Sequence, residues 1–260
     1  MAKKIMLISG HGAGDSGAVA TYNGVKYQEA VETVALVRKI AADLNGYDVD
    51  VSVYPCERDA YQDYKNGTLT LGKSDLLIEI HFNAFKFDSG NGQPKGTEVF
   101  YRPNAVNGAK EAAEQLSAAI AKTLNIPNRG AKQGNYAVIG TANAQGIPAV
   151  LVEVCFIDDF DDFNIYLTRR DAVSAVIART ACDLLGVGKK AEKPSVDTET
   201  PSDWAKDACN WCVKHGLFEG SDGRFNWQKP LTRQDAAVIM QRAFRKFADA
   251  IEKALKEGGA

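Results

Sequence analysis

The sequence predicts an α/β fold, in which a mostly parallel, twisted sheet carries helices on both faces, followed by a small C-terminal all-α module. Two observations lead to this class. Short apolar runs alternate with segments of helical periodicity up to about residue 187, which is typical of parallel sheets. Beyond a segment without hydrophobic periodicity, only helical patterns remain, so the end of the chain is expected to be a separate helical module.

Five apolar runs are expected to form strands, and three longer periodic segments are expected to form helices between them. The runs are Ile5–Ser9, Val49–Tyr54, Leu76–Phe82, Gly96–Tyr101 and Ala149–Val154. The helices are expected near Tyr27–Leu44, Asn107–Leu124 and Phe160–Leu185. A sheet of this kind places its functional site outside the carboxyl ends of its strands.

The segment 188–200 gathers Pro, Ser, Thr and charged residues and loses the hydrophobic pattern. Such a composition is typical of a linker. We therefore expect three parts: a first domain over 1–187, a linker over 188–200 and a second module over 201–260.

The composition excludes several classes of protein. With 260 residues, of which 45% are hydrophobic, the chain can bury a substantial core. The formal net charge of -2 gives no basic excess for binding nucleic acid. No apolar run approaches the ~18 residues of a membrane span. The first residues, MAKKIMLISGHG, lack a secretory apolar region and cleavage site, so synthesis in the cytoplasm is expected.

The five cysteines are an odd number without dense spacing, which indicates reduced thiols rather than a disulfide framework. Cys209 and Cys212 have the spacing of half a zinc ribbon. However, the chain has no second pair, and both residues fall on a helical pattern. We expect them to be structural.

Ligand-type side chains follow several of the predicted strands. His11 comes directly after the first strand, in Ser9-Gly-His-Gly-Ala-Gly14, where glycines let the backbone bend and approach a ligand closely. His81 lies at the end of another apolar run, and Glu153 lies near the end of a third. These side chains are therefore expected to converge on one edge of the sheet.

The first predicted helix offers a further carboxylate. Glu29 lies near its N-terminus, where the helix dipole favours a carboxylate even without a metal, and Glu32 follows one turn later. The pattern alone leaves both open. Two histidines and one carboxylate, with water in the fourth position, form a known catalytic zinc set, and a further carboxylate outside the metal then acts as a base.

Five stretches of the first domain, in this order, resemble the zinc-dependent N-acetylmuramoyl-L-alanine amidases of the Amidase_3 type, found in bacterial autolysins and phage endolysins. They are ISGHGAGDSGA, QEAVETVALVRKIAADL, DLLIEIHFNA, NRGAKQ and PAVLVEVCFIDD. The resemblance implies that His11, Glu29 and His81 bind Zn²⁺ and that Glu153 is the catalytic carboxylate. It also implies the substrate, which is the amide between N-acetylmuramic acid and the L-alanine of the stem peptide in peptidoglycan.

The chain departs from that family pattern at two places. Glu79 stands where the family usually has a small residue, and YQDYKNGTLTLGKSD replaces a segment that often carries Arg and Asn. Glu79 should share a sheet face with His81, so it is expected either to orient that ligand or to pair with a nearby cation. Asn83, Arg129 and Lys132 are expected to bind substrate in the groove, unless they are a turn cap and a solvated loop.

The second module resembles a single S-layer homology motif. Trp204, Ala208, Trp211 and Cys212 have the spacing of one helix face, and Thr232 to Asp235 have the form of a capping box for a second helix. The resemblance implies binding to a secondary cell-wall polymer. A lone motif buries little core, so self-association through the helices is expected, the alternative being a helix packed on the first domain.

The expected function is that of a peptidoglycan amidase, such as a phage endolysin that is made in the host cytoplasm and acts at the Gram-positive cell wall after release. Two alternatives stay open. One is a zinc peptidase that cuts within the stem peptide, and the other is a non-catalytic cell-wall-binding protein. The presence of all four site residues favours an enzyme.

Overall fold

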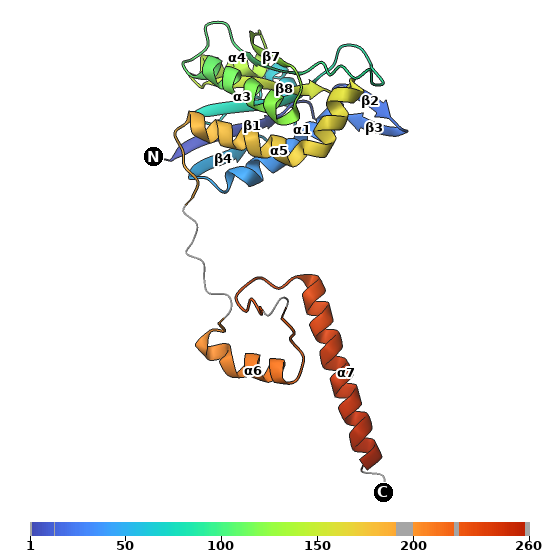
Figure 1. Ribbon diagram of the computed structural model, residues 1–260. Helices are drawn as coiled ribbons and strands as arrows, with labels where there is room; N and C mark the ends of the chain where they lie inside the picture. The colour runs from blue at the N-terminus through green and yellow to red at the C-terminus, as the bar shows by residue number, and fades with distance from the viewer. Residues whose placement is uncertain (1, 13, 191–199, 221–223, 258–260) are drawn as a thin grey trace. The chain divides into compact units, whose positions relative to one another are not determined.

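The computed structural model describes residues 2–12, 14–190, 200–220 and 224–257. The chain forms two compact units, residues 1–190 and residues 191–260 (Figure 1). Among the described residues, no helix has the length and apolar character that crossing a membrane requires.

The first unit contains a six-stranded sheet with the order β4-β1-β5-β8-β6-β7. Neighbouring strands run parallel except β6 and β8, which are antiparallel. The prediction of a mostly parallel sheet is therefore confirmed. The strands are β1 (Lys3–Ser9), β4 (Val49–Val53), β5 (Leu76–Asn83), β6 (Thr97–Tyr101), β7 (Asn128–Gln133) and β8 (Ala149–Phe156).

Helices cover both faces of this sheet, as predicted (Figure 1). α1 (Glu29–Leu44), α3 (Ala109–Leu124) and α5 (Phe160–Leu184) cover one face, and the short helices α2 (Ala60–Lys65) and α4 (Ala137–Ala144) cover the other. Successive strand residues point to opposite faces, so Ile5 and Leu7 join the first core while Met6 and Ile8 join the second. The same alternation directs Glu79, His81 and Glu153 to the face of α2 and α4.

Three kinds of element in the first unit were not predicted. β2 (Val19–Tyr22) and β3 (Val25–Gln28) form a hairpin whose turn is Asn23-Gly24, both with positive φ. This dipeptide suits the tight turn of a two-residue hairpin. Because Gln28 is extended, α1 begins at Glu29 rather than near Tyr27. The short helices α2 and α4 and the strand β7 were also missed.

The second unit contains the short 3₁₀ helix η1 (Asp203–Ala205) and the helices α6 (Lys206–Lys214) and α7 (Arg233–Glu257). Thr232 and Asp235 form the predicted capping box, since the backbone N–H of each donates to the side chain of the other at 3.2 and 3.1 Å. Trp204 and Trp211 are largely exposed within this unit. Most of the predicted linker, residues 191–199, lies outside the described residues.

Candidate metal centre

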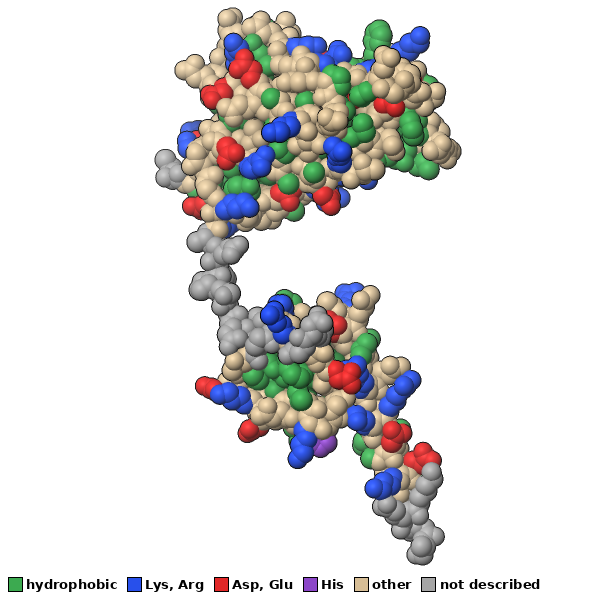
Figure 2. Space-filling model, viewed as in Figure 1, with side chains coloured by type: hydrophobic (Ala, Val, Ile, Leu, Met, Phe, Trp, Pro, Cys, Tyr) green, Lys and Arg blue, Asp and Glu red, His purple; other side chains and the backbone are tan. Residues whose placement is uncertain are grey.

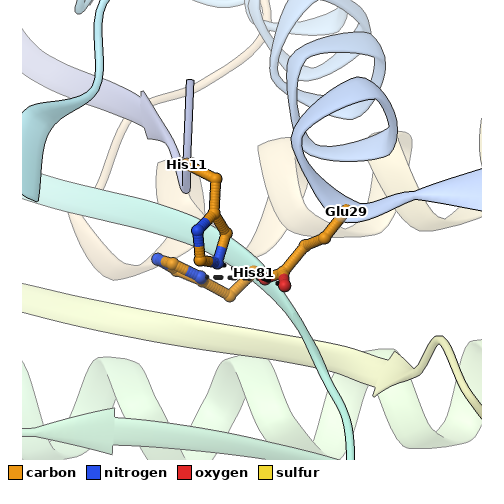
Figure 3. Close-up of side chains that lie close together, drawn as sticks. All are labelled: His11, Glu29 and His81. Atoms are coloured by element: carbon orange, nitrogen blue, oxygen red, sulfur yellow. Dashed lines mark hydrogen bonds and ion pairs between the residues drawn. The ribbon is translucent and has the colours of Figure 1, made fainter. Parts of the chain in front are cut away.

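Three side chains from separate elements meet at the carboxyl end of the sheet. His11 follows β1, Glu29 opens α1 and His81 lies near the end of β5 (Figure 3). Glu29 Oε2 lies 3.1 Å from His11 Nε2, and Glu29 Oε1 lies 3.0 Å from His81 Nδ1. Among the described residues, these are the one group of three His, Cys, Asp or Glu side chains whose ligand atoms all lie within 4.8 Å of one another.

Small residues make this approach possible. A Cβ atom on Gly10 would lie 2.2 Å from Cε1 of the His81 ring, so position 10 must be glycine for the ring to lie where it does. Gly17 has φ +60, and a Cβ there would lie 2.6 Å from the His11 ring. His11 itself has φ +62, a backbone conformation that residues other than glycine adopt only at a cost in energy.

Backbone donors fix the carboxylate of Glu29. The N–H of Ala18 donates to Oε2 at 2.9 Å, and the N–H of Phe82 donates to Oε1 at 3.0 Å. Glu32, the alternative on the same helix, instead accepts a 2.6 Å hydrogen bond from Arg170. The geometry therefore places Glu29, rather than Glu32, with the histidines.

Each histidine has a further carboxylate behind it. His11 Nδ1 lies 2.9 Å from Asp15 Oδ2, and His81 Nε2 lies 3.3 Å from Glu79 Oε1. Such contacts fix which ring nitrogen carries the proton and leave the other to bind a metal. Of the two roles expected for Glu79, the geometry favours the one that orients His81.

The three groups are coupled electrostatically. Burial alone would lower the pKa of His11, but the hydrogen bond and charge of Glu29 and the hydrogen bond to Asp15 raise this pKa to about 9. Burial disfavours the charged form of Glu29, yet its bonds to both histidines hold its pKa below the ordinary value. The surroundings of the two histidine rings therefore favour positive charge at their nitrogens. A divalent cation bound to the neutral rings would supply positive charge at the same place.

Glu153 lies beside this group but outside it. It is the register partner of His81 on the neighbouring strand β8, and both line a cavity of about 620 Å³. Burial, followed by the charge of Glu29, raises the pKa of Glu153 to about 7, against the opposite effect of His81. Its Oε2 atom is buried and has no hydrogen-bond partner among the described residues. A carboxyl in this environment is suited to accept and return a proton near neutral pH.

The donor set fits zinc. Two imidazole nitrogens and one carboxylate, each held by a further hydrogen-bond partner, are a three-ligand set that catalytic Zn²⁺ sites use while leaving one position open. Glu153, which is not among the three, remains available for proton transfer.

The predicted substrate-binding residues lie in a neighbouring group. Asn83 ends β5, and Arg129 and Lys132 lie on β7 rather than in a loop. All three contact the buried Glu98 of β6: Asn83 Nδ2 donates at 2.7 Å, Arg129 Nε donates at 2.6 Å, and Lys132 forms an ion pair with the same carboxylate. The sequence interpretation missed Glu98, for which the available signal was a charged residue inside an apolar strand.

Comparison with known proteins agrees with this architecture. The sequence matches the N-acetylmuramoyl-L-alanine amidase family over residues 5–181 and the S-layer homology domain over residues 198–237. A probable cell wall amidase, LytH, of Staphylococcus saprophyticus is 32% identical over 160 residues, which are 62% of this chain and 50% of the relative. The endolysin of Bacillus phage SPP1 is 29% identical over 201 residues, 74% of this chain and 69% of that protein.

A solved structure shares the fold. The N-acetylmuramoyl-L-alanine amidase from Clostridium difficile 630 superimposes with a TM-score of 0.57 at 24% identity, over 71% of this chain and 97% of that one. The chain spans about half the length of the LytH relatives that it matches. Because the family match covers residues 5–181 of 260, the chain belongs to the N-acetylmuramoyl-L-alanine amidase family.

Proposed function

We propose that this protein is a peptidoglycan hydrolase that cleaves the amide between N-acetylmuramic acid and the L-alanine of the stem peptide. The observation that carries the proposal is the meeting of His11, Glu29 and His81 beside the separate carboxyl of Glu153, in a chain of this family. A non-catalytic wall-binding protein has no need of a metal-ligand group that lies next to a buried, unpartnered carboxyl oxygen.

The metal is proposed to be Zn²⁺, held by His11 Nε2, His81 Nδ1 and the Glu29 carboxylate. When bound, Zn²⁺ polarises a carbonyl as a Lewis acid and makes water nucleophilic near neutral pH. Asp15 and Glu79 keep the two rings in the tautomer that leaves these nitrogens unprotonated. Another divalent ion can occupy such a donor set in vitro.

Glu153 performs the proton transfers. Its Oε2 accepts a proton from the attacking water and then delivers it to the nitrogen of the departing L-alanine, so one carboxyl is base and acid in turn. Burial raises the pKa of Glu153 above that of an ordinary carboxyl, which favours its role as a proton carrier.

The peptide side of the substrate is proposed to meet Asn83, Arg129 and Lys132. Asn83 lines the cavity, and Glu98 holds the three donors together. Two cations against one carboxylate leave a positive excess there, which suits the carboxylates and carbonyls of a stem peptide.

Residues 1–187 are proposed as the catalytic domain, 188–200 as a linker and 201–260 as a module that binds a secondary cell-wall polymer. The match to the S-layer homology domain over residues 198–237 supports the last assignment. An endolysin made in the host cytoplasm and released to the wall at lysis is the setting that we propose, supported by the similarity to the phage SPP1 endolysin.

The second module is also proposed to associate with a second copy of itself. Met240, Phe244, Phe247, Ile251 and Leu255 follow one another at intervals of three or four residues along α7, and all are exposed. In the view of Figure 2, the visible face of this helix carries mainly charged side chains. Such an apolar stripe is complementary to another copy of the same helix. Sedimentation of the full chain tests this: Phe244→Glu with Phe247→Glu should give monomers, whereas Arg245→Ala should not. A monomeric unmodified chain would exclude self-association.

Product analysis tests the catalytic proposal. Purified Gram-positive cell walls are digested with the zinc-loaded protein, with and without a chelator, and the soluble products are identified by mass spectrometry. The amidase releases stem peptides with a free L-alanine amine and leaves the sugar strands intact. Cuts within the stem peptide would indicate a zinc peptidase instead, and binding without any release would indicate a wall-binding protein.

A further inference from the structure

Two exposed tyrosines line the cavity of the candidate metal centre. Tyr61 and Tyr64 both lie on α2, their ring centroids are 6.4 Å apart and their planes differ by 17°. They are 51% and 47% exposed, although both line the same cavity as His11, His81 and Glu153. A pair of stacked, half-exposed rings in a cleft is a candidate contact surface for a ligand.

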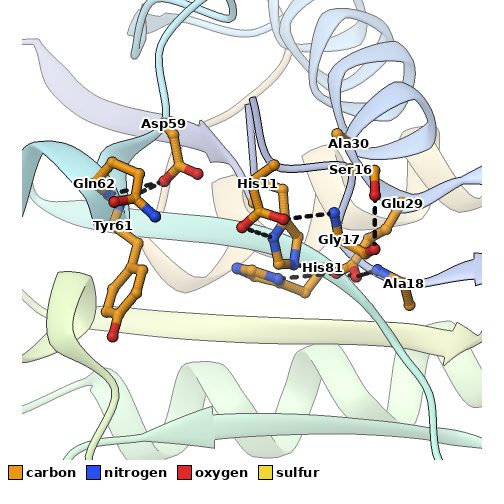
Figure 4. Close-up of polar contacts among 12 residues, drawn as sticks. His11, Ser16, Gly17, Ala18, Glu29, Ala30, Asp59, Tyr61, Gln62 and His81 are labelled. Carbon is orange, nitrogen blue, oxygen red and sulfur yellow. Dashed lines mark hydrogen bonds and ion pairs between the residues drawn. The ribbon is translucent and has the colours of Figure 1, made fainter. Parts of the chain in front are cut away.

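The backbone that carries these rings is held firmly. Asp59 Oδ1 accepts hydrogen bonds from the N–H groups of Tyr61 and Gln62 at 2.8 and 3.0 Å, which caps the helix (Figure 4). Tyr54 donates to Asp63 at 2.6 Å, and Arg58 donates to both oxygens of the same carboxylate at 2.8 and 2.7 Å. A single-turn helix needs such anchors, because its own hydrogen bonds are too few to maintain it. The tyrosine pair is therefore presented in a fixed position.

The order of the strands places this pair on one flank of the metal group. α2 follows β4, the edge strand next to β1, which leads to His11. On the other side of β5 and β8 come β6 and β7, with Glu98, Arg129 and Lys132. The tyrosine pair of α2 thus lies on one flank of the cleft and the basic residues of β7 lie on the other, where Tyr136 is a further aromatic residue that lines the cavity. The groups proposed to hydrolyse the amide lie between the two flanks.

The two halves of the substrate differ in the same way. On the proposed function, the scissile amide joins a sugar that belongs to a glycan strand to a peptide that carries carboxylates. The basic flank suits the peptide. The apolar faces of sugar rings pack on aromatic rings, and phenolic O–H groups form hydrogen bonds with sugar hydroxyl and acetamido groups.

We propose that Tyr61 and Tyr64 form the glycan-binding subsite of this cleft, which contacts N-acetylated sugar rings of the strand on the sugar side of the scissile amide. This inference rests on the proposed function for the orientation of the substrate. It assigns a role to α2, which lies in the segment where the sequence departs from the family pattern.

Binding and kinetics of the full-length, zinc-loaded chain test this assignment. The binding probe is a peptide-free glycan strand of N-acetylglucosamine and N-acetylmuramic acid that carries no secondary polymer. Calorimetry is expected to show that Tyr61→Ala with Tyr64→Ala weakens binding by about tenfold or more. The corresponding Phe variants, which keep the rings, should retain most of the affinity. Phe87→Ala is the matched control, because Phe87 is an exposed aromatic residue outside the cavity.

Two substrates then separate the subsite from the catalytic proposal. One carries a disaccharide on the stem peptide, and the other carries only a lactyl group. The double Ala variant should lose kcat/KM on the first, mainly through KM, and behave like the unmodified protein on the second. Equal losses on both substrates, or unchanged glycan binding, would overturn the subsite. If the unmodified protein cleaves neither substrate yet binds glycan through the tyrosines, the catalytic proposal fails and the subsite stands.

Discussion

His81 Nε2 lies 3.3 Å from Glu79 Oε1, while Nδ1, the other ring nitrogen, faces Glu29. A carboxylate at this position accepts a hydrogen bond from Nε2–H and so leaves Nδ1 with the lone pair that a metal needs. The family resemblance did not suggest it, because a small residue is usual at this position.

Replacing Glu79 should therefore weaken metal binding. Glu79→Ala is expected to lower the affinity for Zn²⁺ about 10- to 100-fold, which is the usual effect of removing a residue that holds a metal ligand in place. Glu79→Gln should lower the affinity less, because its amide oxygen can still accept the hydrogen bond from Nε2–H of His81. Competition with a chromophoric chelator measures both. Glu57→Ala, an exposed glutamate, serves as the control. Unchanged affinity in Glu79→Ala would show that the contact has no influence on the ligand.

A second prediction concerns Gly10. Because a Cβ there would lie 2.2 Å from Cε1 and 2.4 Å from Nε2 of His81, Gly10→Ala should displace the ring and weaken Zn²⁺ binding by about tenfold or more. Gly46→Ala is the matched control, since its new Cβ would approach only Asp43 O, at 3.4 Å. Equal metal affinities in the two variants would mean that the ring moves aside without loss.

Much of the site could be predicted from the sequence, because it lies on the most strongly marked elements. β1, β5 and β8 are apolar runs with fully buried residues, and His11, His81 and Glu153 interrupt or follow them. The identity of the helical carboxylate could not be derived from the pattern alone. Glu29 and Glu32 are both buried, so burial does not distinguish them. The packing of α1 against α5 is what brings Glu32 to Arg170.

The missed elements have a physical reason in common. β7 is an edge strand of polar, partly buried residues, so its hydrophobic pattern is weak. The two cationic partners of Glu98, Arg129 and Lys132, are 31 and 34 residues away in sequence, and the register of β6 on β7 brings them close to it. Likewise, α2 has only six residues, too few to show a helical period, and it is anchored by Tyr54, Arg58 and Asp59, which precede it. The pairing of β6 with β7 depends on tertiary structure, which local patterns do not encode.

Substitutions of Glu153 and His81 should distinguish the residue needed only for catalysis from the residue needed for metal binding. Glu153→Ala is expected to bind Zn²⁺ at the stoichiometry of the unmodified protein while losing wall lysis by at least about 100-fold, because it removes the proton carrier and no ligand. His81→Ala should lose both. Metal content measured by atomic spectroscopy and lysis measured by turbidity distinguish the two variants. If Glu153→Ala also lost the metal, Glu153 would have to be counted among the ligands.

Glu98 gives a prediction about pH and stability. Burial disfavours its charged form, but Lys132 and Arg129 more than compensate and lower its pKa in the folded state. A carboxyl whose pKa is depressed on folding stabilises the protein above its unfolded pKa of about 4.3, and this contribution disappears as the pH falls through the folded value. In Glu98→Gln, the free energy of unfolding should be about 1–3 kcal/mol lower at neutral pH and should fall less steeply below about pH 4.5.

The unfolding of the first unit can be followed separately. All nine tyrosines lie in residues 1–190 and all three tryptophans lie beyond it, so tyrosine circular dichroism reports on the unit that contains Glu98. Glu114→Gln is the matched control, because its exposed pair with Lys110, at 3.6 Å, should contribute little. If the buried ion pair acts as proposed, the free energy of unfolding of Glu114→Gln should follow that of the unmodified protein at every pH. The free energy of unfolding of Glu98→Gln should be lower than that of the unmodified protein at neutral pH, and this difference should become smaller as the pH falls below about 4.5. A constant difference at all pH values would mean that Glu98 acts through packing rather than through its charge.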